Sequence, residues 1–418
     1  MSNKVLIVSY TFPPASGVGG RRWSKLSLQL AQRGHTVHII TASSDSDGEH
    51  VTENWNGVTV HRIPGKYPRI LTHFDKKNIL QKISYRLNTM FLKYTVRGNI
   101  FDRSVKWRRL LQKSVIELVR NENIHNIIVS APPFQQLYYI AELKKRFPKL
   151  NIILDFRDPW VELPDFHKIN MSSMPKKRMR YQEYMEKYAL LHADYVVGIS
   201  AALTENLRKF GNGEKEKYLT VTNGFDSSDY HFPDNYKSNP DDEFRILYNG
   251  SLYLNTGDTN QRLVEFINKN CETLVKRKVK FEFCGHISQE NLAIFEKADN
   301  RIFAYHGFKP VNEALSLLQK ASVALFITDL GHQDIQFNTK LMDYIALRKK
   351  IFLIGPAGAV SRFITDNRIG VQFTNETMDN MLEWIMNREK LEQLSYRDFD
   401  TSPFEFSNLS KQFERILV

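Results

Sequence analysis

The chain of 418 residues is longer than one compact core requires and suits two domains of roughly 200 residues each. Its content of 42% hydrophobic and 25% charged residues excludes a disordered or fibrous protein, and its two cysteines, Cys271 and Cys284, exclude a disulfide framework and indicate a reducing cytoplasm. The formal net charge of +12 directs attention to anionic partners, and no apolar run approaches the ~20 residues of a membrane-spanning helix.

The first half of the chain alternates short apolar runs with longer amphipathic segments. This alternation predicts a parallel sheet covered by helices, and the first apolar run is too short for a signal peptide. The expected strands are Val5–Ser9, Thr36–Thr41, Ile127–Ser130, Ile152–Asp155 and Tyr195–Ser200. The expected helices are Arg22–Gly34, Phe134–Arg146 and Ser200–Phe210.

A second domain is expected after a polar segment, residues 226–243, which has two prolines and no apolar periodicity and so predicts a linker. The alternation then restarts, with strands expected at Arg245–Asn249, Lys280–Cys284, Ile302–Tyr305, Val323–Ile327 and Lys350–Ile354. Helices are expected at Asn260–Asn270, Glu290–Ala298, Val311–Gln319 and Thr339–Leu347.

These elements predict an α/β protein of two Rossmann-like, doubly wound lobes facing a central cleft, where ligands of such sheets bind. The first domain is expected at 1–225 and the second at 244–400. Residues 401–418 include the amphipathic run Ser407–Leu417, which predicts a C-terminal helix that packs back on the first domain.

The positive charge is concentrated between Lys66 and Arg120. This segment, 66–120, has fourteen Lys/Arg against three acidic residues, and aromatic residues are interleaved with them. Such a mixture suits an anionic bilayer surface, where each basic residue contributes about 1 kcal/mol, or a solvated helical face. Nucleic acid is disfavoured because no recognition motif accompanies the charge.

A glycine-rich loop follows the first expected strand and includes Gly19, Gly20 and Arg21. Glycines beside a helix start let backbone N–H groups approach a phosphate, and Arg21 with Arg22 adds paired donors. The spacing matches neither G-x-G-x-x-G nor the P-loop. The two interpretations are a contact with phosphate or acceptor and a tight turn without a ligand.

Charged residues stand directly after the expected strand that ends at Asp155. Arg157 and Asp158 are candidate catalytic residues, because the carboxyl end of a strand is where ligands of open α/β sheets bind. Pro159 holds Asp158 extended. The alternative is a structural ion pair between the carboxylates and the arginine.

Two later stretches are candidates for donor contacts. Asn223 precedes Gly224 in a turn after a strand expected at Val221–Thr222, which either shapes the site or is only a turn. In the second stretch, Asn338 or Thr339 is a good N-cap, so the amide groups that open this helix, through Lys340 and Leu341, face a diphosphate. Lys340 adds positive charge, and Asp343 is suited to accept hydrogen bonds from ribose hydroxyls. The alternative for Asp343 is a favourable interaction with the helix dipole.

Taken in order, these motifs resemble glycosyltransferase family 4, retaining enzymes of the GT-B fold, and within it the type that builds bacterial surface polysaccharides. The resemblance spans nearly the whole chain. It rests on Phe12-Pro13-Pro14 to Gly20, Gly34-His35-Thr36-Val37, Asp155 to Trp160, Ala193 to Ser200, Thr222 to Asp226, Asn249-Gly250-Ser251, Gly285-His286, Gly307 and Thr339 to Tyr344.

The resemblance implies metal-independent transfer of a sugar from a nucleoside diphosphate to an acceptor hydroxyl, with no cofactor. The first domain then lies on the acceptor side and the second holds the nucleotide sugar, with Gly250, Ser251 and Gly285 among the donor contacts. The acceptor is expected to be a glycan or a lipid-linked saccharide, with residues 66–120 at the inner membrane surface.

The chain departs from the family pattern at three places. Asp343 stands where the family has the second glutamate of its E-x7-E motif, which binds ribose, and Ile335 replaces the first. The basic pair expected after Ser251 is reduced to Arg262, so Lys340 or Arg21 is expected to compensate. Arg157 and Asp158 stand where many members carry a histidine.

Two other functions remain open from the sequence. One is a non-hydrolysing nucleotide-sugar epimerase, which uses the same two-lobed fold and needs added acid/base groups. The other is a catalytically silent nucleotide-sugar-binding scaffold, which the isoleucine at position 335 brings into consideration.

Overall fold

The computed structural model describes residues 3–14, 18–43, 50–75, 77–161, 174–230, 243–252, 257–328 and 337–418. The chain divides into two compact units: unit 1 is Met1–Thr222 with Phe406–Val418, and unit 2 is Asn223–Glu405. The boundaries between the two units lie a few residues from those expected, at which the first domain ends at 225 and the second at 400. Unit 2 begins at Asn223 because the residues that follow pair with its far end, where Phe225 N donates to Phe404 O at 3.0 Å.

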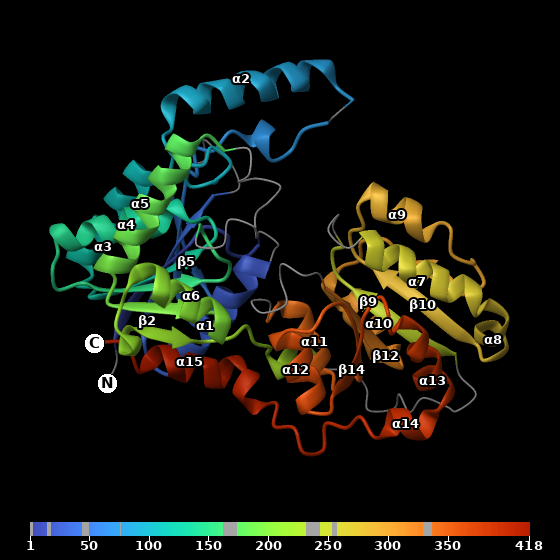
Figure 1. The fold of residues 1–418 in the computed structure, drawn as a ribbon. Coiled ribbons are helices and arrows are strands. Elements are labelled where there is room, and N and C mark those ends of the chain that lie inside the picture. The colour runs from blue at the N-terminus through green and yellow to red at the C-terminus, as the bar shows by residue number, and fades with distance from the viewer. Residues whose placement is uncertain are drawn as a thin grey trace. The chain divides into compact units, whose positions relative to one another are not determined.

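Unit 1 is built on an eight-stranded sheet in the order β3-β4-β2-β1-β5-β6-β7-β8, in which only β3 and β4 pair antiparallel (Figure 1). Its strands are β1 (Lys4–Ser9), β2 (Thr36–Ala42), β3 (Val51–Trp55), β4 (Val58–Ile63), β5 (Asn126–Ala131), β6 (Asn151–Phe156), β7 (Tyr195–Gly198) and β8 (Tyr218–Thr220). The central strands β5 and β6 are buried along their whole length, as a parallel sheet covered on both faces requires.

The helices of unit 1 include one from the C-terminus. They are α1 (Val18–Gln32), α2 (Ile79–Thr95), α3 (Arg108–Asn121), α4 (Gln135–Ala141), α5 (Lys176–His192), α6 (Ala201–Gly211) and α15 (Phe406–Glu414). α15 packs against α1, where the rings of Trp23 and Phe413 meet edge to face at 5.0 Å. Both helices join the sheet residues Ile7, Ile39 and Ile128 in one apolar cluster.

Unit 2 is a six-stranded, fully parallel sheet in the order β11-β10-β9-β12-β13-β14. Its strands are β9 (Phe244–Asn249), β10 (Val279–Cys284), β11 (Phe303–Tyr305), β12 (Val323–Ile327), β13 (Ile351–Ile354) and β14 (Gly370–Phe373). Its helices are α7 (Gly257–Lys269), α8 (Cys271–Lys276), α9 (Gln289–Phe295), α10 (Val311–Lys320), α11 (Thr339–Ala346), α12 (Ala359–Asp366), α13 (Met381–Met386) and α14 (Arg388–Glu392).

The two faces of the unit 2 sheet carry separate cores. Alternate residues of β9 divide between them: Ile246 and Tyr248 pack with α7, α8, α9, α13 and α14, whereas Leu247 packs with α10, α11 and α12. The structure therefore confirms an α/β fold of two doubly wound units. Among the residues that the structure describes, no helix has the length and apolar content to cross a bilayer.

The expected strand at Val221–Thr222 is wrong, because β8 ends at Thr220 and neither residue belongs to a strand, although Val221 N donates to Gly198 O at 3.0 Å. The sequence analysis also missed the β3–β4 hairpin, which turns at Asn56 and Gly57, both with positive φ. A two-residue Asn-Gly connection is typical of such a hairpin.

Candidate functional site

The carboxyl edge of the unit 2 sheet has two glycines in unusually close packing. Gly250 follows β9 with φ +133°, and Gly285 follows β10 with φ +132°. A Cβ on Gly285 would lie 2.2 Å from Gly250 O, and a Cβ on Gly250 would lie 2.6 Å from Lys340 Cδ. Only glycine fits at either position, because a side chain on Gly285 would overlap the Gly250 backbone and one on Gly250 would overlap Lys340, both at a positive φ.

Helix α11 begins beside these glycines. Of the two N-caps that the sequence allows, Asn338 is the one observed, and its side chain accepts a hydrogen bond from Leu341 N at 3.1 Å. The backbone N–H groups of Thr339 and Lys340 precede the first bond of the helical ladder and so point out of the helix start. Asn223 Nδ2 donates to Phe337 O at 2.9 Å and steadies the entry to the helix. Ile335 and Gln336 lie outside the described residues.

Lys340 folds back from α11 onto the strand ends. Its Nζ lies 2.5 Å from Tyr248 Oη, 3.2 Å from Ser251 O and 4.4 Å from the centre of the Tyr248 ring. Burial lowers the pKa of Lys340 to about 7, because the charged ammonium loses water. The lysine therefore changes charge near neutral pH, and an anion nearby would favour its protonated form.

Asp343 lies one turn further along α11 and is buried, with 8% of its surface exposed. The hydroxyl of Tyr230 donates to Asp343 Oδ1 at 2.5 Å. The sequence analysis missed Tyr230, because it stands in the polar segment that reads as a linker. Tyr248 was also missed, since a tyrosine inside a buried strand reads as core.

Most of the predicted donor residues gather at this place, whereas Arg262 lies elsewhere in unit 2 and Gly19, Gly20 and Arg21 belong to unit 1. Gly250, Ser251, Gly285, Asn223 and the first turns of α11 surround Lys340 through the contacts above. Arg262 lies on α7, where its guanidinium pairs with Asp379 at 3.2 Å and donates to Asn375 O at 3.2 Å. Arg262 is thus held by Asp379 and Asn375 and has no described contact with the residues around Lys340, and its role in donor binding stays a prediction.

In unit 1, Gly19 and Arg157 lie in contact. A Cβ on Gly19 would lie 2.5 Å from Arg157 Nη1, and Arg157 Nη2 donates to Pro132 O at 2.6 Å. Burial lowers the pKa of the Arg157 guanidinium, and the neighbouring carboxylates of Asp158 and Asp155 oppose that effect. Gly20 and Arg21 follow Gly19 in the first turn of α1. The glycine-rich loop and the end of β6 therefore meet.

The sequence suggested an ion pair between Arg157 and its neighbouring carboxylates. In the structure, Asp155 pairs with Arg22 instead. Arg22 holds Asp155 through two bonds, Nη2 to Oδ1 at 2.9 Å and Nε to Oδ2 at 3.2 Å, and both side chains are buried. Trp23 Nε1 and Ser130 Oγ also donate to Asp155 Oδ2. Arg22 is therefore a structural residue, and its expected role as a phosphate donor is wrong.

The two sites are rich in amide, guanidinium and ammonium groups. No set of three or more His, Cys, Asp and Glu side chains suited to a metal ion occurs within the described ranges of the chain. Fixed cations and helix-start dipoles of this kind stabilise developing negative charge on oxygen.

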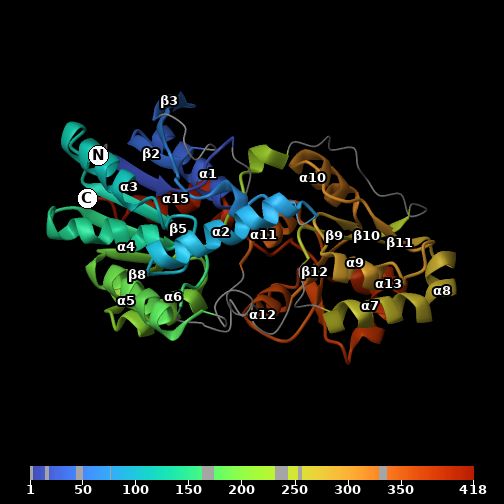
Figure 2. The same ribbon diagram turned by 90° about the horizontal axis from the view of Figure 1, so that it is seen from above.

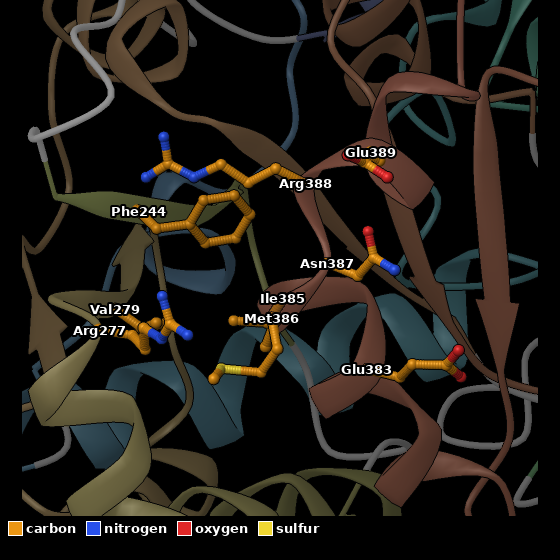
Figure 3. A pocket seen from close by; sticks show the side chains of 9 residues that line it. All are labelled: Phe244, Arg277, Val279, Glu383, Ile385, Met386, Asn387, Arg388 and Glu389. Atoms are coloured by element: carbon orange, nitrogen blue, oxygen red, sulfur yellow. The ribbon is translucent and has the colours of Figure 1, made fainter.

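A cavity of about 530 Å³ lies at the opposite edge of the unit 2 sheet (Figure 3). Phe244 and Val279, the first residues of β9 and β10, line it together with Arg277, Ile385, Met386 and residues 383 and 387–389. None of the predicted site residues belongs to it. Because ligands of open α/β sheets bind at the carboxyl ends of the strands, the α11 edge remains the candidate donor site.

Residues 17–224 match the family model described as "Glycosyl transferase 4-like domain". These residues therefore form a domain of this glycosyltransferase family. A sequence search of curated proteins finds no match.

Solved structures of glycosyltransferases share the fold of the whole chain. A sucrose-phosphate synthase from Thermosynechococcus elongatus superposes with a TM-score of 0.65 at 12% identity, covering 99% of this chain and 98% of the other. An Escherichia coli structure described as trehalose-6-phosphate bound with UDP-2-fluoro glucose gives 0.68 at 11% identity, with 99% and 98% covered. A glycosyltransferase from Rickettsia africae gives 0.61 at 12% identity, with 99% and 97% covered. This likeness shows that the chain has the GT-B fold, and the family match over residues 17–224 identifies it as a glycosyltransferase.

Proposed function

We propose that this glycosyltransferase moves a sugar from a nucleoside-diphosphate sugar to an acceptor hydroxyl, with retention of the anomeric configuration and without a metal ion. The observation that supports this most is the packing of Lys340 against Gly250 and Ser251 at the start of α11. In the E. coli structure that shares the fold, the bound molecule is UDP-2-fluoro glucose, so a UDP-sugar is the first donor to test.

The proposed chemistry places the departing diphosphate at the start of α11. When the bond between the anomeric carbon and the diphosphate oxygen breaks, the electron pair leaves with the diphosphate. The N–H groups of Thr339 and Lys340, the helix dipole and the Lys340 ammonium are positioned to stabilise that charge. The acceptor hydroxyl oxygen forms the new bond to the anomeric carbon and gives up its proton to an oxygen of the departing diphosphate.

For the nucleoside, we propose that Asp343 accepts hydrogen bonds from the ribose hydroxyls. The Tyr230 hydroxyl, which donates to Asp343 Oδ1, then stands where a ribose hydroxyl donates in the complex. Exchange of one hydroxyl donor for another leaves the buried carboxylate satisfied in both states.

Unit 1 is proposed to act on the acceptor side. Arg157 and Asp158 are the proposed catalytic residues there, and Gly19, Gly20 and Arg21 complete the group through the contact of Gly19 with the Arg157 guanidinium. A fixed guanidinium is suited to the negative charge of the reaction, since arginine stays protonated despite its burial.

The acceptor is proposed to be a glycan or lipid-linked saccharide of a surface polysaccharide or glycolipid. The basic segment 66–120 supports this, because an anionic inner membrane surface attracts such a segment. The protein would then work in the cytoplasm, at the face of the membrane.

The test is a thermal-shift screen of nucleoside diphosphates, followed by incubation of the matching nucleotide sugars with acceptor extracts. A ligand that binds only the native state raises the melting temperature. Release of nucleoside diphosphate that depends on the acceptor, and is lost in Arg157→Gln, supports the proposal. Binding without any turnover would instead indicate a silent scaffold, and formation of an epimer without acceptor would indicate an epimerase.

A further inference from the structure

Helix α2 presents its apolar side to solvent. Seven large apolar side chains of this helix are exposed, from 49% for Ile83 to 84% for Tyr94, and the others are Ile79, Leu80, Leu87, Met90 and Phe91. At 3.6 residues per turn these positions fall within an arc of about 120°. We name these seven side chains the apolar arc. A surface helix of a globular protein normally turns such a stripe toward the core.

The side of α2 that faces the unit is mostly polar, with Gln81, Ser84, Asn88 and Thr89 half-buried and Leu92 the one buried residue described in this helix. Leu92 packs with Tyr67, Ile100 and Val105 in a small separate core. Figure 1 shows α2 lying apart from α3 and α4, with one end beside α5, and Figure 2, drawn from above, shows it nearest to the viewer.

Contacts to the rest of unit 1 fix this orientation. Arg178 of α5 donates from Nη1 to Val96 O and Gly98 O, both at 2.7 Å, at the C-terminal end of α2. In the first half of α2, the ring of Tyr85 contacts that of Phe74, which precedes the helix, and the two ring centres are 4.6 Å apart. Since the polar side of α2 is the half-buried one, the apolar arc faces outward.

Basic side chains border the apolar arc on one side. Lys82, Arg86 and Lys93 are exposed and fall within about 60° of Ile79 around the helix. The sequence of α2 has no acidic residue. An exposed apolar arc beside a cationic border is the pattern of a helix that lies in the plane of a membrane interface.

We propose that α2 is the element that docks this protein on an anionic bilayer, with the apolar arc among the acyl chains and Lys82, Arg86 and Lys93 at the lipid phosphates. The inference rests on the proposed membrane surface of segment 66–120 and not on the donor chemistry. A second copy of the chain fits the arc less well, because two paired α2 helices would bring like charges together with no acidic partner.

The experiment is co-sedimentation of the full-length protein with two kinds of vesicle, phosphatidylcholine with added phosphatidylglycerol and phosphatidylcholine alone. Leu87→Gln tests the arc, and Leu191→Gln on α5 is its matched control, because both leucines are exposed, at 57% and 68%. The double variant Lys82→Gln/Arg86→Gln tests the cationic border. Its control is the double variant Lys276→Gln/Lys297→Gln, which changes two exposed lysines of unit 2.

The proposal predicts binding that needs the anionic lipid. The double neutralisation on α2 is expected to lower the partition coefficient about 25-fold, at about fivefold for each basic residue, and Leu87→Gln is expected to weaken binding as well. Both controls should bind like the wild type. The docking proposal would be overturned by equal binding to both vesicles or by no binding to either. It would also be overturned by a dimer in sedimentation velocity that Leu87→Gln dissociates. A nucleoside diphosphate thermal shift, measured on the same variants, reports separately on the proposed enzyme function.

Discussion

The pH dependence of nucleoside diphosphate binding follows from the environment of Lys340. In the free protein its pKa is lowered to about 7 by burial. The protonated form is the one that attracts a diphosphate, so binding is strongest below pH 7 and weakens as the pH rises through that value. Between about pH 7 and pH 9 the protonated fraction falls from roughly one half to roughly one hundredth, which predicts about a 50-fold loss of affinity.

The assay is isothermal titration calorimetry across this pH range, with variants that separate Lys340 from Lys349, a second lysine of unit 2 with a lowered pKa. The Lys349 pKa is also lowered, to about 8, but this lysine donates to Ala321 O at 2.7 Å and lies outside the proposed site. Lys340→Gln should bind weakly with no loss between pH 7 and 9, whereas Lys349→Gln should keep the wild-type profile. The diphosphate itself gains negative charge above a pKa of about 6, which acts in the opposite direction. An affinity that stays level or rises from pH 7 to 9 in the wild type would refute the reasoning.

Three further changes test other parts of the account. Asp343→Ala should leave the protein folded but weaken nucleoside diphosphate binding by roughly 10- to 100-fold, because hydrogen bonds to a charged group are lost. If calorimetry finds the same affinity, the ribose assignment is wrong. Gly285→Ala should lower the free energy of unfolding by about 1–3 kcal/mol, because its Cβ would lie 2.2 Å from Gly250 O at a positive φ; an unchanged urea midpoint would contradict this. Asp155→Asn should cost about 3–5 kcal/mol of unfolding free energy by leaving Arg22 buried and unpaired, and a midpoint equal to that of the wild type would show that the pair is not structural.

The sequence was sufficient for features that depend on local patterns. Strand β12 was predicted at its observed bounds, and the N-cap of α11 was predicted at Asn338 or Thr339 and lies at Asn338, because apolar runs and capping residues act over a few positions. The gathering of Gly250, Gly285 and Lys340 also follows, since residues after parallel strands meet at one edge of the sheet.

Features that depend on distant partners were not predictable in the same way. The pairing of Arg22 with Asp155 joins residues 133 positions apart, and nothing local distinguishes it from a pair with Arg157. Arg262 was placed by its distance along the chain from Ser251, but the helical phase of α7 turns it toward Asp379. The amphipathic pattern of α2 shows that one side is apolar, whereas only tertiary anchoring decides that this side faces outward.

The most direct measurement is a crystal structure of the complex with the nucleoside diphosphate that gives the largest thermal shift. The account predicts phosphate oxygens within hydrogen-bonding distance of Lys340 Nζ and of the Thr339 and Lys340 amides, with the ribose at Asp343. A nucleotide found instead in the cavity beside Phe244 and Arg277 would contradict it.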